Sequence, residues 1–109
     1  MKFNKEEFTF DLKLANRKAL MAAESIIDDG SINMDCAFVR IPYIRETKVV
    51  DAISVAGLSC SGRTDWFGSG YMIRPTVIGS ASKNTVVVET FVEELKKLGY
   101  DATTFYMAD

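Results

Sequence analysis

The chain has 109 residues, of which 48% are apolar and 26% are charged, and its formal net charge is −2. This length predicts a single domain over residues 1–109, and the apolar content predicts a real hydrophobic core and excludes a disordered chain. The small negative charge gives no general attraction to nucleic acid or to acidic membranes. No apolar run approaches the roughly 18 residues of a membrane span, so no membrane partner is expected.

Histidine is absent from the sequence, and the only cysteines are Cys36 and Cys60. The absence of histidine removes the commonest general base and the commonest metal ligand. Two cysteines do not make a disulfide framework, and Met1–Phe10 has no apolar segment of the kind found in secretory leaders. We therefore expect a reduced, cytoplasmic, non-enzymatic protein without a metal or a cofactor.

The N-terminal stretch carries two competing patterns. Glu7–Ala15 alternates polar and apolar residues, which is typical of a strand. Asn4 and Glu7 have the spacing of a capping box, and the apolar residues that follow also fit a heptad, which favours one continuous helix. The interpretation adopted is a strand over 7–14 followed by a helix over 16–29.

The middle of the chain predicts three elements. Residues 36–41 form a strand pattern ended by a proline, and residues 70–74 form another. Residues 47–56 fit a short helix, although their β-branched residues also fit a strand. We expect the helix.

The C-terminal part gives the clearest local signals. Asn84 is expected to cap a helix whose apolar residues recur at steps of three and four, and Gly99 is expected to end it. Residues 101–107 alternate threonines and aromatic residues, which predicts a strand. Together the elements predict an α+β, two-layer sandwich with one mostly antiparallel sheet and two main helices on one face. The closest simple arrangement is a ferredoxin-like topology with an insertion.

The segment Gly57–Lys83 is the expected binding region. It holds five of the seven glycines and the densest group of aromatic residues and arginines in the chain. Tryptophan, tyrosine and arginine dominate binding hot spots. We therefore expect an interaction protein that binds a protein partner or a second copy of itself, of the kind that phages encode as small accessory or inhibitor proteins. The expected partner-binding residues are Arg63, Trp66, Phe67, Tyr71 and Arg74.

An alternative interpretation is a site for a small phosphorylated or nucleotide ligand. Glycine- and serine-rich turns can present backbone amides to an anion, and a helix N-terminus attracts negative charge. The expected anion-binding residues are Arg63, Arg74, Ser82 and Lys83.

Two other functions are disfavoured by the residues. Only Ser61 and Gly62 separate Cys60 from Arg63, whereas the anion loop of cysteine phosphatases and rhodaneses needs a longer spacer to wrap a phosphate-sized anion. The aromatic residues would suit stacking on single-stranded nucleic acid, but the chain lacks a basic stripe, so nucleic-acid binding is not expected.

Overall fold

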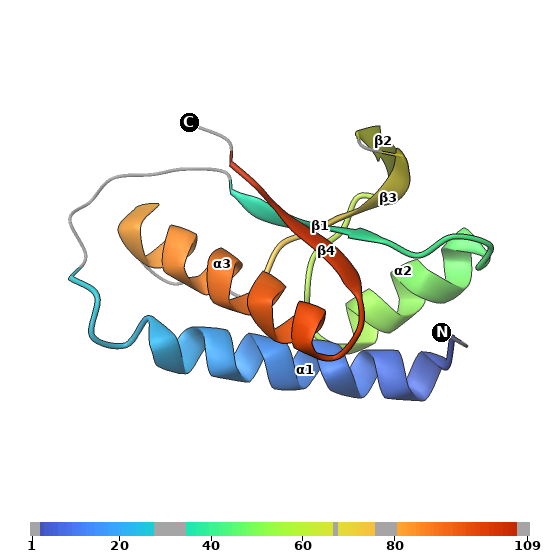
Figure 1. Cartoon of the computed structure of the whole chain (residues 1–109). Helices are drawn as coiled ribbons and strands as arrows, with labels where there is room; N and C mark the ends of the chain where they lie inside the picture. The colour runs from blue at the N-terminus through green and yellow to red at the C-terminus, as the bar shows by residue number, and fades with distance from the viewer. Residues whose placement is uncertain (1–2, 28–34, 67, 76–80, 107–109) are drawn as a thin grey trace.

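A computed structural model describes residues 3–27, 35–66, 68–75 and 81–106 (Figure 1). These residues form three helices and four strands, in the order α1 (Lys5–Ala22), β1 (Cys36–Arg40), α2 (Glu46–Val55), β2 (Arg63–Trp66), β3 (Gly68–Ile73), α3 (Ala81–Lys97) and β4 (Asp101–Phe105).

The four strands form one sheet in the order β2-β3-β1-β4, and every neighbouring pair is antiparallel. Along the chain α2 connects β1 to β2 and α3 connects β3 to β4, which is the connectivity of the ferredoxin-like split βαβ topology. The prediction of an α+β two-layer sandwich is confirmed. The additional element is helix α1, which precedes the first strand.

All three helices lie on one side of the sheet, where α1 packs against both α2 and α3 (Figure 1). Side chains of the helices and of the facing side of the sheet form one buried cluster. Its large members with the least exposure include Phe8, Leu12, Val39, Ile53, Tyr71, Ile73, Val88, Phe91 and Leu95.

The predicted strand over 7–14 is wrong, because this stretch belongs to helix α1. Asn4 is the N-cap, and its side-chain oxygen accepts a 2.8 Å hydrogen bond from the amide of Glu7. Phe8 and Leu12, four residues apart, are buried, whereas Phe10 is 64% exposed. The capping and the helical spacing of the buried residues therefore outweigh the local alternation.

The end of α1 also differs from the prediction of a helix over 16–29. The helix ends at Ala22, and Ala23 is its C-cap. Residues 24–27 are not helical, and residues 28 and 29 lie outside the described part of the chain. Helix α1 thus begins at Lys5 instead of residue 16 and ends at Ala22 instead of residue 29.

Helix α3 begins before the predicted cap. It starts at Ala81, so Asn84 lies in its first turn and is only 7% exposed. Residues 81–83 contain no helix breaker, so the helix extends backward past Asn84. The predicted end is confirmed: the helix stops at Lys97, and Gly99 adopts a positive φ of 95°.

The other predicted elements occur in the structure close to their expected positions. The helix expected over 47–56 is found as α2, and the strands expected at 36–41, 70–74 and 101–107 are found as β1, β3 and β4, which end at Arg40, Ile73 and Phe105. Residue 107 lies outside the described residues. Strand β2 was not predicted, because Arg63–Trp66 is polar at three of its four positions and exposed throughout. It forms by pairing with β3 in a hairpin, where Trp66 stands opposite Gly68.

Candidate functional site

The two sides of the sheet carry different residues because side chains alternate along each strand. Ala37 and Val39 of β1 point into the core beneath the helices. The residues between and beside them, Cys36, Phe38 and Arg40, therefore point to the opposite side. We call this side the helix-free face.

An aromatic cluster crosses the helix-free face. The ring of Trp66 meets Phe38 edge-on, with centroids 5.3 Å apart, and meets Phe105 in the same manner at 4.6 Å. Phe38 is only 1% exposed, although the helices lie on the other side of the sheet. Trp66 itself is 37% exposed. The indole therefore covers part of the sheet while presenting apolar surface of its own.

A glycine on β3 makes room for this cluster. A β-carbon added at Gly70 would lie 2.6 Å from Cζ of Phe38 and 2.9 Å from the carbonyl oxygen of Val39. No side chain larger than hydrogen fits there without displacing the ring or the backbone. The phenyl ring of Phe38 lies where that side chain would be, so the glycine is needed for the packing beneath Trp66.

A cavity of about 610 Å³ opens where Phe105 ends the aromatic cluster. It combines apolar, sulfur-containing and hydroxyl side chains with one basic side chain. The residues that line it are Cys36, Ser59, Cys60, Ser61, Met72, Arg74 and Phe105.

Both cysteines are free, and both belong to this cavity. The thiol of Cys36 lies 3.5 Å from the sulfur of Met72, and the amide of Gly62 donates to the sulfur of Cys60 at 3.4 Å. Burial raises the pKa of both thiols, although Arg74 opposes that rise at Cys36 and the backbone of Gly62 opposes it at Cys60. At neutral pH the two thiols are therefore protonated, which makes them weak nucleophiles.

A second arginine on the same face is paired. Arg40 holds the carboxylate of Asp101 in a fork, with hydrogen bonds of 2.9 and 3.1 Å across β1 and β4. The hydrogen bond to Asp101 raises the pKa of Arg40, and the charges of the two groups cancel. This end of the helix-free face is close to neutral.

The expected partner-binding residues divide between the two sides of the sheet. Trp66 and Arg74 lie on the helix-free face. Tyr71 lies on the other side and is 0% exposed, so it belongs to the core. Arg63 donates to the carbonyl of Ile44 at 2.8 Å and to the hydroxyl of Tyr71 at 3.3 Å, which fastens β2 to the start of α2. Phe67 lies outside the described residues.

The fold does not bring together the two arginines expected for the anion site. Arg63 and Arg74 lie on opposite sides of the β2–β3 hairpin. Lys83 lies half-buried in the first turn of α3, and the side chain of Ser82 is outside what the structure describes. Within the described residues no contact joins Lys83 to either arginine.

Sequence reasoning missed three contributors to the helix-free face: Phe38, Met72 and Phe105. Phe38 and Met72 stand opposite each other on β1 and β3. The alternation along residues 101–107 did predict that Phe105 and its immediate neighbours point to opposite sides of the sheet. Only the strand pairing, however, shows that these three side chains share a surface with Trp66.

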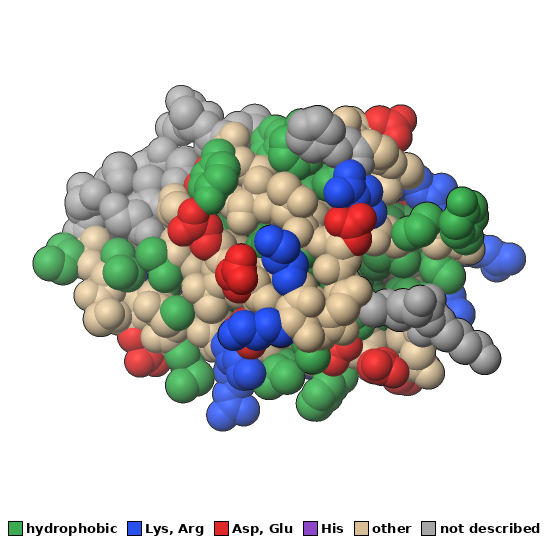
Figure 2. All heavy atoms as spheres, in the orientation of Figure 1, with side chains coloured by type: hydrophobic (Ala, Val, Ile, Leu, Met, Phe, Trp, Pro, Cys, Tyr) green, Lys and Arg blue, Asp and Glu red, His purple; other side chains and the backbone are tan. Residues whose placement is uncertain are grey.

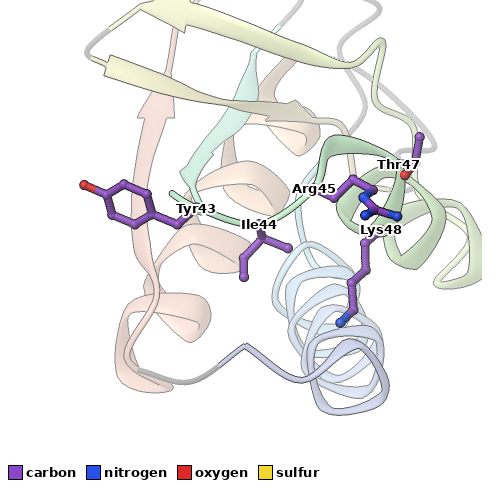
Figure 3. Close-up of a pocket in the computed structure, with 5 residues that line it drawn as sticks. All are labelled: Tyr43, Ile44, Arg45, Thr47 and Lys48. Carbon is purple, nitrogen blue, oxygen red and sulfur yellow. The ribbon is translucent and has the colours of Figure 1, made fainter.

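A second hollow, of about 490 Å³, lies at the N-terminus of α2 and is lined by Tyr43, Ile44, Arg45, Thr47 and Lys48 (Figure 3). Tyr43 is fully exposed and has a positive φ of 65°. Its side chain points away from those of Arg45 and Lys48 (Figure 3). The ammonium group of Lys48 lies 5.6 Å from the centre of the ring of Phe3. These side chains do not converge on one point, so the helix-free face is the stronger candidate.

The side of the molecule formed by α1 and α3 carries interspersed acidic and basic side chains (Figure 2). Ion pairs there join Lys18 and Lys97 to Glu94, and Lys96 to Glu93. This mixture leaves no single-sign field on that side.

The described residues show neither a membrane-spanning helix nor a cluster of metal ligands. Neither α1, α2 nor α3 is long and apolar enough to cross a membrane. Within the same ranges, no three histidine, cysteine or acidic side chains come together as metal ligands would.

The structure thus defines an α+β sandwich of ferredoxin-like connectivity with an added N-terminal helix and an aromatic, helix-free sheet face. Comparisons of the chain with models of protein families, with curated proteins and with solved structures found no significant match.

Proposed function

We propose that this protein is a non-enzymatic interaction module that binds a protein partner through the helix-free face of its sheet. The observation that carries the proposal is the aromatic cluster of Trp66, Phe38 and Phe105, in which a 37% exposed indole lies over the sheet. Tryptophan is the residue type most enriched in binding hot spots. Exposed aromatic surface on a rigid sheet binds with little loss of conformational entropy.

Two further observations support the proposal. The chain has no histidine, and burial raises the pKa of both thiols, so it offers few groups suited to general-base or nucleophilic catalysis. A cytoplasmic location is part of the proposal, since both cysteines are free, as expected in a reducing compartment.

The test uses a substitution that blocks the face without emptying the core. Thr103 is half-buried on β4 and pairs with Phe38, so a lysine at this position would extend over the aromatic cluster. We expect Thr103→Lys to remove partner capture from lysate of the cells that carry the gene, while the unfolding free energy stays within about 1 kcal/mol of the wild type.

The matched control is Thr47→Lys, at an exposed position of α2 beside the second hollow. It should leave capture unchanged. If Thr47→Lys abolishes capture and Thr103→Lys does not, the interface lies at the start of α2 and the proposal is wrong. Native mass measured without lysate separates capture of a partner from self-association.

A further inference from the structure

Arg74 occupies a special position on the helix-free face. It is exposed, it lies just beyond β3, and its backbone pairs with that of Ser59. Its side chain is the one basic group among the described residues that line the 610 Å³ cavity. The aromatic cluster reaches this cavity through Phe105, which lines it and also contacts Trp66.

The described lining of this cavity carries one charged group, the guanidinium of Arg74, because its serines are neutral and its two thiols are protonated. Burial, and to a smaller extent the carboxylates of Asp35 and Glu46 outside the lining, raises the pKa of Cys36 and Cys60 respectively. Arg40 of β1, the other arginine placed on this face, is already neutralised by Asp101. Among the described residues of the helix-free face, Arg74 is therefore the arginine that no carboxylate holds in an ion pair.

The surroundings of Arg74 are suited to a ligand that joins a negative group to an apolar one. Met72 and Phe105 supply apolar wall within the cavity, and Trp66 continues it along the face. Ser59 and Ser61 add hydroxyl donors. A negative group would contact the guanidinium while an apolar group covers the rings.

The chemistry favours a carboxylate over a phosphate. A planar guanidinium binds one carboxylate through two parallel hydrogen bonds. Phosphate groups carry more charge, and proteins bind them with clusters of arginines or at helix N-termini. Here Arg63, the nearest arginine in the sequence, is held by the carbonyl of Ile44 on the other side of the sheet.

The size of the face favours a peptide over a folded domain or a second copy. Four strands of about five residues cover roughly 19 Å by roughly 17 Å, or about 320 Å² of plane. Stable complexes between folded proteins bury about 800 Å² on each partner. An extended segment of about six residues, roughly 20 Å long, matches the face better.

We propose, on the basis of the function proposed above, that the partner presents an extended acidic segment in which one aspartate or glutamate carboxylate pairs with Arg74 and a neighbouring apolar side chain packs on Phe105 and Trp66. The probe is a library of random peptides displayed on phage and selected on the immobilised full chain. We expect the selected peptides to share an acidic residue beside an apolar one.

Affinity is then measured with the best peptide as a synthetic ligand. Trp66 is the only tryptophan of the chain, so its fluorescence reports directly on this face. Arg74→Glu should weaken peptide binding about tenfold or more, whereas Arg74→Lys should weaken it less. Replacing the acidic residue of the peptide by its amide should weaken binding to the wild-type protein by as much as Arg74→Glu does. Arg17→Glu, at an exposed position of α1 on the helix side, is the charge-matched control and should have no effect. Reselection on the Arg74→Glu variant should enrich basic peptides.

The outcomes separate this inference from the function on which it rests. One outcome is that the selected peptides share no acidic residue, and that their binding is abolished by Thr103→Lys but unchanged by Arg74→Glu. That result would overturn the proposed contact between Arg74 and a carboxylate, but it would support the helix-free face as the interface. A phosphoserine in place of the acid that binds about tenfold tighter would also overturn it. Selected peptides insensitive to both variants, or a selection that enriches none, would count against both proposals.

Discussion

Trp66 and Phe105 belong to strands on opposite edges of the sheet, yet their rings meet at a centroid distance of 4.6 Å with an interplanar angle of 83°. The contact depends on Phe38, which lies over Gly70 and supports the indole from below. The β2–β3 hairpin rises on the side of the sheet away from the helices (Figure 1). One tryptophan thus ties the hairpin to the last strand and forms the centre of the proposed interface.

Replacing Gly70 by alanine should destabilise the protein. The new β-carbon would lie 2.6 Å from the ring of Phe38 and 2.9 Å from a backbone oxygen, so the ring and Trp66 must shift. Overpacking of this kind costs about 1–3 kcal/mol. Urea unfolding should report the loss, and the tryptophan emission should move to longer wavelength. Ser69→Ala, at the exposed neighbouring position, should change neither quantity.

Tyr100 should make stability fall at high pH. Its hydroxyl donates a 2.5 Å hydrogen bond to Asp11, a carboxylate only 8% exposed on α1. Burial, followed by this hydrogen bond, raises the pKa of Tyr100 in the folded state. A raised folded-state pKa gives stability that is complete below the ordinary value of about 10 and is lost as the pH rises above it.

The Tyr100→Phe variant tests this dependence. It should cost about 1–3 kcal/mol at neutral pH, because a buried carboxylate loses a donor. Its stability should then fall less steeply than that of the wild type between about pH 9 and pH 11. Tyr43→Phe, at a fully exposed ring, is the control and should follow the wild-type curve. Parallel curves for all three proteins would contradict the assigned role of Tyr100.

Asn4→Ala should destabilise the N-terminal helix. The side chain of Asn4 accepts from the amide of Glu7, and removal of such a cap costs about 1 kcal/mol. Asn4→Asp keeps an acceptor and should restore the stability. Urea unfolding followed by circular dichroism measures both changes. Equal stability of the alanine and aspartate variants would mean that the cap contributes nothing to α1.

Arg63→Ala should affect stability and leave partner affinity unchanged. The guanidinium of Arg63 donates to the carbonyl of Ile44 and to the hydroxyl of Tyr71, so its loss should cost about 1 kcal/mol. Asp65→Ala, at another exposed position of β2, is the comparison variant and should be neutral. If Arg63→Ala lowers peptide affinity while the unfolding free energy is unchanged, Arg63 is part of the interface and this prediction is wrong.

The two thiols should react slowly and at different rates with iodoacetamide at neutral pH. The thiolate is the reactive form, and burial raises the pKa of both groups. Cys36 is 4% exposed and Cys60 is more accessible, so Cys60 should be labelled first. Mass spectrometry of the single variants Cys36→Ser and Cys60→Ser assigns each rate. Labelling of either cysteine faster than a free thiol would contradict the burial argument.

Local signals in the sequence specified most of the elements. The heptad after Asn4, the stripe of α3 and the alternation of residues 101–107 each depend on neighbours within a few positions, so they can be interpreted without tertiary information. The one serious error, a strand over 7–14, arose because two periods overlapped and only burial distinguishes them. Phe10 fitted the alternation, but no partner covers it in the fold, and it is 64% exposed.

The sequence by itself determined the fold class, the positions of three strands and the segment that contains Trp66 and Arg74, because periodicity and composition are local properties. Tertiary structure alone decided which side of the sheet each of these residues occupies. In the fold, Arg63 and Tyr71 lie on the opposite side of the sheet from Trp66, whereas Phe105, from the other edge strand, contacts the indole. Strand order and register set these distances, and they follow from packing of the whole core.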